Sequence, residues 1–181
     1  MAMGPILQLA QGEAELEEGR YAMAISRARK VLIRDPNHLG GLELLARAHW
    51  RAGEFDWCLD ALRHLIRLNP YEPGYYYLRA SSLQATGRYG EAVREYGRCL
   101  SSDNESLRAP ANAAIRDLER WQESVIAGML ASDQVFQAEY ALDPMAACGN
   151  RGFAFSAENS RTSTQIAASR DVPELLWDRP S

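Results

Sequence analysis

Apolar residues recur every three or four positions through most of the first hundred residues. The stretches 22–33 and 92–100 show this spacing, which is typical of helices that bury one face. Glycine-containing breaks separate the apolar stretches, and the prolines at 36 and 70 prevent the preceding helix from continuing. The pattern therefore predicts an all-α chain of short helices.

These helices are predicted to form a repeating unit. Gly19, Gly53 and Gly87 stand 34 residues apart, and each opens the same phrase of glycine, a charged residue and an aromatic residue. A small residue follows each aromatic residue by three positions, at 24, 58 and 92. The glycine permits the left-handed conformation that ends a helix, and the small residue lets two helices approach closely. A fixed period of this length predicts a solenoid of helix pairs, an architecture used mainly to hold other proteins.

The repeating unit resembles that of the tetratricopeptide repeat family. The resemblance covers residues 5–105, in three copies at about 5–38, 39–72 and 73–106. The second copy matches the family best, at Leu42, Leu45, Ala46, Gly53, Phe55, Cys58, Leu62, Leu65 and Pro70. The resemblance implies an all-α fold, a right-handed superhelix of three helix pairs with a capping helix and a small helical C-terminal region.

Two of the copies depart from the family pattern. The first has Gln8, Gln11 and Glu15 at core positions of its first helix, which indicates a polar end cap or a frayed start. The third has Arg79 where a leucine is usual and Asn104 in place of the closing proline. The family's positions therefore transfer best onto the second copy.

One long helix is predicted after the repeats end at Asp103. Pro110 is expected as its first residue, and 111–132 carries apolar residues mostly on one stripe. The corresponding domain is a capping helix at 106–131, because a solenoid needs a terminal helix with a polar outer face.

Residues 132–156 are predicted to form a small helical subdomain. Ser132 or Asp133 caps one short helix, and Asp143 caps another that starts at Pro144. The segment also resembles the short helical leader segments of nitrile-hydratase-like precursor peptides, at Phe136, Leu142-Asp143-Pro144, Ala146-Ala147 and Gly152-Phe153. Packing on the end of the solenoid is the alternative explanation of the same residues.

Residues 157–181 are predicted to be a flexible tail, because they begin with a polar stretch. The tail ends in an apolar docking segment at 172–180 that contains Leu175, Leu176 and Trp177. This segment could fold back onto its own solenoid or groove, bind a neighbouring copy and so drive self-association, or bind a partner.

Composition argues against several classes of protein. A net charge of −4 disfavours nucleic-acid binding, which normally needs a basic face. No run of 18 apolar residues occurs, so no membrane span is predicted, and the first nine residues lack the features of a secretory signal. Cys58 and Cys99 fall on core positions and are expected as buried thiols in a reducing compartment, so the predicted location is cytoplasmic. No metal-binding, phosphate-binding or catalytic motif occurs, so no enzymatic activity, metal or cofactor is predicted.

The family resemblance implies a concave groove lined by the first helix of each pair. Carried onto this chain, the inward positions are Glu13, Leu16, Glu17, Glu43, Arg47, Trp50, Arg51, Tyr77, Ser81, Gln84 and Ala85. Glu43, Arg47 and Arg51 are spaced by four, so they share one helix face and could form solvated ion pairs. Alternatively, the two arginines take a carboxylate from a partner, with Trp50 and Tyr77 as anchors, since these residue types are enriched at binding hot spots.

The expected function is that of a non-catalytic adaptor or scaffold. Family members that clamp the acidic tails of heat-shock chaperones use basic residues and asparagine at positions that here hold Leu9, Glu13, Leu44, Gly74 and Leu78. That clamp is absent, and a ligand of mixed charge is expected instead. The predicted partner is a protein or peptide, bound through the groove and the C-terminal region, in an adaptor or a subunit of a larger assembly. The alternative is a precursor or substrate-presenting protein whose segment 126–156 is recognised by a modifying enzyme.

Overall fold

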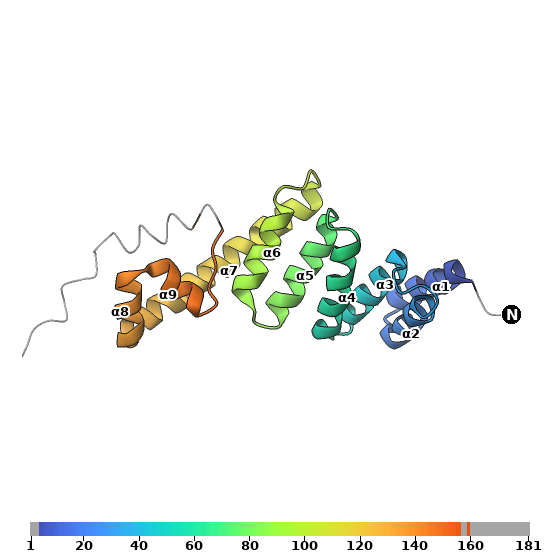
Figure 1. Cartoon of the computed structure of the whole chain (residues 1–181), viewed down its shortest axis with the longest axis horizontal. Helices are drawn as coiled ribbons and strands as arrows, with labels where there is room; N and C mark the ends of the chain where they lie inside the picture. The colour runs from blue at the N-terminus through green and yellow to red at the C-terminus, as the bar shows by residue number, and fades with distance from the viewer. Residues whose placement is uncertain (1–3, 157–158, 160–181) are drawn as a thin grey trace, which may run out of the picture.

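The computed structural model describes residues 4–156 and 159, and this part of the chain forms nine α-helices without a strand. The helices are α1 Pro5–Glu17, α2 Tyr21–Leu32, α3 Leu39–Arg51, α4 Phe55–Leu68, α5 Pro73–Ala85, α6 Tyr89–Cys99, α7 Glu105–Ser132, α8 Gln134–Leu142 and α9 Pro144–Asn150. Successive helix pairs follow one another along the long axis of the molecule, with α8 and α9 at the end opposite the N-terminus (Figure 1). The predicted all-α helical repeat superhelix is confirmed.

The turn within each pair has the predicted conformation. Gly19, Gly53 and Gly87 have φ values of 76°, 75° and 77°, in the left-handed region that favours glycine. The small residues three positions past each aromatic residue are completely buried between the paired helices. The repeated sequence phrase therefore produces the same tight helix pair three times.

The core is continuous because each apolar cluster joins one pair to the next. One cluster joins α1 and α2 to α3, a second joins α3 and α4 to α5, and a third extends from α4 to α7. A single pair exposes one apolar face, and the first helix of the following pair covers it. The thiols of Cys58 and Cys99 lie in these clusters with no exposed surface, as predicted.

The polar positions of the first and third copies are occupied by internal ion pairs. Glu15 is buried on α1, and Arg27 Nη2 on α2 lies 3.2 Å from its carboxylate. Arg27 Nη1 also donates to Gln8 Oε1 at 3.3 Å. In the third copy, Arg79 reaches Glu95 on α6 at 3.6 Å. Glu15 and Gln8 of the first helix are therefore tied to α2, whereas the buried Oε1 of Gln11 has no hydrogen-bond partner among the described residues.

The prediction that Pro110 begins the long helix was wrong. Helix α7 begins at Glu105, where the side chain of Asn104 accepts a hydrogen bond from Ser106 N, and Pro110 lies inside the helix. The asparagine supplies an N-cap ahead of the proline, and proline near a helix end removes only one backbone hydrogen bond. The predicted caps of the next two helices are correct, because Asp133 caps α8 and Asp143 caps α9.

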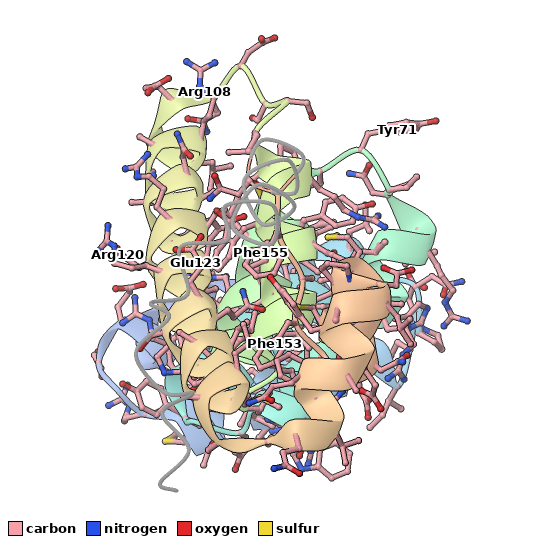
Figure 2. All side chains as sticks on the ribbon, turned by 90° about the vertical axis from the view of Figure 1, so that its left-hand side faces the viewer. Tyr71, Arg108, Arg120, Glu123, Phe153 and Phe155 are labelled. Atoms are coloured by element: carbon pink, nitrogen blue, oxygen red, sulfur yellow. The ribbon has the colours of Figure 1, made fainter. Side chains whose placement is uncertain are left out.

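Residues 152–156 return as an extended segment along α7. The side chain of Gln122 makes two hydrogen bonds to the backbone of Ala154, at 2.9 and 3.0 Å, and the buried carboxylate of Glu119 accepts from Ser156 N. Phe153 and Phe155 pack against a small core formed by α7, α8 and α9, and Figure 2 shows both rings beside α7. The predicted docking residues of the tail, Leu175, Leu176 and Trp177, lie outside the described residues.

Candidate functional site

An apolar pocket opens between the first helices of the second and third pairs. Its volume is about 220 Å³. Leu62 and Leu65 of α4 form its floor, with Ala46 of α3 and Leu78 of α5 at its sides. Glu43, Arg47, Gly74 and Tyr75 complete the lining. Two of the residues that the sequence predicted for the groove, Glu43 and Arg47, thus line this pocket.

The size of two facing residues explains why the pocket lies here and not one repeat earlier. Gly12 on α1 faces Leu44 on α3, and a Cβ at Gly12 would lie 2.4 Å from Leu44 Cδ2. Because glycine has no Cβ, α1 and α3 approach closely and Leu44 is completely buried. One repeat later the equivalent residues are Ala46 and Leu78, and Leu78 is only partly buried. Ala46 and Leu78 both line the pocket between α3 and α5.

The rim of the pocket carries a carboxylate that is held by a tyrosine. Tyr75 Oη donates a hydrogen bond to Glu43 Oε1. Burial raises the pKa of Tyr75 above its ordinary value, and the hydrogen bond to Glu43 and the charges of Glu43 and Glu72 raise it further. Tyr75 is therefore a permanent donor at neutral pH, and it orients the Glu43 side chain at the edge of the pocket.

Arg47, on the same rim, points to the first pair. Its Nη1 lies 2.8 and 3.0 Å from the two carboxylate oxygens of Glu13, and its Nη2 lies 3.6 Å from Glu17. The side chain is 44 % exposed, so water screens these ion pairs and each contributes less than about 1 kcal/mol. The guanidinium is nonetheless occupied by two carboxylates of the protein itself.

The groove residues predicted from the sequence divide into three groups. The structure brings Glu13, Glu17, Glu43 and Arg47 together beside the pocket. Arg51 instead lines a shallow hollow together with Gly19, Arg20, Tyr21 and other residues of α2 and of the turns between α1 and α2 and between α3 and α4. The expected row of Glu43, Arg47 and Arg51 is therefore split between two places, because Arg47 and Glu43 find partners on neighbouring helices.

The other predicted groove residues lie in contacts between helices: Trp50 joins the second pair to the third, and Tyr77 and Gln84 contact α6 within the third pair. Leu16, predicted to face the groove, is instead buried in the core between α1, α2 and α3. Trp50 Nε1 donates to Ser81 Oγ at 3.2 Å, and Tyr96 Oη of α6 donates to Gln84 Oε1 at 3.0 Å. The ring of Tyr77 meets that of Tyr96 edge-on, with centroids 5.4 Å apart. Trp50 and Tyr77 are thus engaged in contacts between helices, and the open apolar space lies at the pocket instead.

Sequence reasoning assigned the pocket residues Leu62 and Leu65 to the core and did not place Tyr75 in the site. Leu78 appeared only as a position where a basic clamp residue is missing. The signal that could have found the pocket is the change from Gly12 to Ala46 at the same position of successive repeats.

The histidines and cysteines have structural partners. His49 Nδ1 lies 2.5 Å from Glu54 Oε2 in the core, and His64 Nε2 lies 2.9 Å from Asn37 Oδ1. All three cysteines are free and buried. Within residues 4–156 and 159, no group of three or more His, Cys, Asp or Glu side chains could hold a metal ion. In the same part of the chain, no helix combines the length and apolar character needed to cross a membrane.

Comparison with known proteins agrees with this architecture. Residues 17–99 match the sequence profile of the family described as "Anaphase-promoting complex, cyclosome, subunit 3". No curated protein matches the chain. The solved structure "First TPR of Spaghetti (RPAP3) bound to HSP90 peptide SRMEEVD" is similar, with 20 % identity, a TM-score of 0.57, and coverage of 64 % of this chain and 93 % of that chain. The first TPR domain of the human RPAP3 protein is also similar, with 22 % identity and a TM-score of 0.55. This match covers 65 % of the present chain and 98 % of that chain. The resemblance seen in the sequence is thereby confirmed, and the chain has the fold of the tetratricopeptide repeat domains.

Proposed function

We propose that this protein is a non-catalytic binding module that holds a peptide segment of a partner protein across α3 and α5. The observation that supports this function is the apolar pocket with charged groups only at its rim. Its volume of about 220 Å³ is large enough for one leucine, methionine or phenylalanine side chain. Burial of such a side chain stabilises a complex by roughly 1.5–3 kcal/mol before the costs of association.

The fold supports this class of function. Solenoids of helix pairs present an extended concave surface that is used mainly to hold other proteins. The similar first TPR domain of Spaghetti (RPAP3) was solved bound to an HSP90 peptide. The buried free thiols fit the reducing compartment expected from the sequence, so a cytoplasmic adaptor or assembly subunit remains the proposed setting.

The structure gives little support to the alternative of a precursor read by a modifying enzyme. Phe136 is completely buried, Asp143 caps α9, and Gly152 has a positive φ of 81° at the turn after that helix. Phe153 packs on the same small core. These roles in folding account for four of the eight residues that carried the leader-like resemblance, and we therefore favour the binding module.

The proposal is tested by filling the pocket. Gly74 lines it at the start of α5, and a Cβ there would meet only the flexible end of the Glu72 side chain, at 3.1 Å. Gly74→Leu is therefore expected to crowd the pocket lining, with the Glu72 side chain shifting aside at the start of the helix. Gly97→Leu is the matched control, because Gly97 lies on α6 with nothing within 4 Å of an added Cβ.

The measurement is quantitative affinity co-purification from the source cells with both variants and the unaltered chain. We expect Gly74→Leu to lose at least one partner that the unaltered chain and Gly97→Leu retain, with all three proteins melting cooperatively. An identical set of partners for all three would place the binding surface elsewhere and refute the proposal.

A further inference from the structure

The charges around the pocket indicate the chemistry of the peptide, provided that the proposed function holds. Four carboxylates, those of Glu13, Glu17, Glu43 and Glu72, lie on or beside the rim, together with the guanidinium of Arg47. We infer that the pocket selects a partner segment in which the apolar anchor stands next to lysine or arginine. Acidic residues beside the anchor are disfavoured.

Arg47 is poorly placed to attract an acidic peptide. Glu13 and Glu17 already contact its guanidinium from α1, and together they outweigh its charge. A carboxylate of a ligand that reached Arg47 would come close to both of them, and like charges disfavour each other within a few ångströms. The arginine that sequence reasoning assigned to a partner's carboxylate therefore belongs to an internal network.

The opposite wall of the rim is acidic as well. Glu43 accepts a hydrogen bond from Tyr75, and a carboxylate has further lone pairs that a lysine or arginine can use. Glu72 caps α5 by accepting from Gly74 N at 3.0 Å, directly beside the pocket lining. A cation next to the anchor would thus approach two carboxylates on this wall without displacing any contact. Such charge-assisted hydrogen bonds are the stronger kind.

Three of the five positions that lack the family's basic clamp lie at this same site. Leu78 and Gly74 line the pocket, and Glu13 holds Arg47. The solved relative binds a peptide that ends in Glu-Glu-Val-Asp. In the present protein an apolar space and carboxylates stand where the clamp residues are expected, so the ligand charge is reversed.

The test begins with an unbiased probe, a phage-displayed library of random dodecapeptides. The library is selected on the intact protein and counter-selected on Gly74→Leu, so that only peptides that need the pocket remain. We expect enrichment of leucine, methionine or phenylalanine flanked by lysine or arginine. The best synthetic peptide is then measured by fluorescence polarisation, and raising the salt from low to high concentration should weaken its binding.

Two single substitutions distinguish the charge preference from simple apolar binding. Glu43→Gln should weaken binding of the selected peptide about threefold, as expected for the loss of one exposed ion pair. Arg47→Gln should tighten it by a similar factor, because Glu13 and Glu17 are then no longer neutralised. Glu91→Gln is the control, since Glu91 pairs with Arg88 on α6 and should leave the affinity unchanged.

The outcomes separate the two proposals. Enrichment of acidic or uncharged flanks, or weaker binding by Arg47→Gln, would overturn the basic-ligand inference and leave the pocket as a binding site. Recovery of no peptide that depends on the pocket would overturn the proposed function itself. A synthetic peptide of residues 172–180 that displaces the selected peptide and binds more tightly would show that the chain's own tail occupies the pocket. That result would overturn the inference that the ligand is a basic segment of a separate partner.

Discussion

Gly90 is a point of close approach between α6 and the returning segment 152–156, and replacing it with alanine tests that packing. A Cβ at Gly90 would lie 2.0 Å from the carbonyl oxygen of Gly152 and 3.0 Å from Ala154 N. Both neighbours are backbone atoms, which cannot rotate away as the end of a side chain can. The segment must therefore move by about 1.4 Å, from 2.0 Å to the 3.4 Å at which ordinary van der Waals contact begins.

That displacement acts against two hydrogen bonds. Gln122 holds the backbone of Ala154 with a donated and an accepted bond, and each is worth about 0.5–1.5 kcal/mol. Losing both costs about 1–3 kcal/mol, and the gain from replacing glycine within a helix offsets about 0.5–1 kcal/mol of this. Gly90→Ala should therefore be neutral to destabilising by about 2 kcal/mol. Gly97→Ala, on the same helix with open space around it, should stabilise by about 0.5–1 kcal/mol.

The assay is hydrogen–deuterium exchange of the 152–156 segment, combined with denaturant unfolding of both variants. We expect faster exchange at the Ala154 amide in Gly90→Ala and unchanged exchange there in Gly97→Ala. If Gly90→Ala stabilised the protein as much as its control and kept the Ala154 amide protected, the segment would not lie against α6, and the reasoning would fail.

Three further predictions concern the turns, the buried thiols and a helix cap. Gly53→Val should lower the unfolding free energy by more than about 1 kcal/mol, because a β-branched residue is strained at a φ of 75°; an unchanged melting temperature would contradict this. Burial raises the pKa of Cys58 and of Cys99 to about 11, so each thiol contributes stability that is complete below about pH 9. That contribution is lost as the pH rises from about 9 towards 11, because the thiols ionise at lower pH in the unfolded chain than in the folded protein. The free energy of unfolding, measured with denaturant, should therefore be lower at pH 10.5 than at pH 8.5 by on the order of 1–2 kcal/mol per thiol. The corresponding alanine variants should lack this difference. Asp143→Ala should destabilise α9 by about 1 kcal/mol through loss of the bond from Ala146 N, and normal protection of that amide would argue against the cap.

The elements that depend on local sequence could be predicted. The turn glycines, the caps at Asp133 and Asp143, and the buried cysteines each follow from the preference of a residue type for one backbone conformation or for burial. Because the three copies share one period, equivalent residues of each copy lie in equivalent surroundings, and the same local preferences could be applied to all three. The start of α7 was missed because two start signals, Asn104 and Pro110, compete within six residues, and only the observed cap shows which one begins the helix.

The binding surface was decided by contacts between repeats. The sequence by itself determined which helices form, because the helices follow from periodicity and turn residues. Only the tertiary structure decided that Arg47 turns to Glu13 on α1, and that α3 and α5 stand apart over a pocket while α1 and α3 do not. The physical reason is that the distance between neighbouring helices depends on the joint size of facing side chains. Those pairs, such as Gly12 with Leu44 and Ala46 with Leu78, lie about a repeat apart in the chain and meet only in the fold.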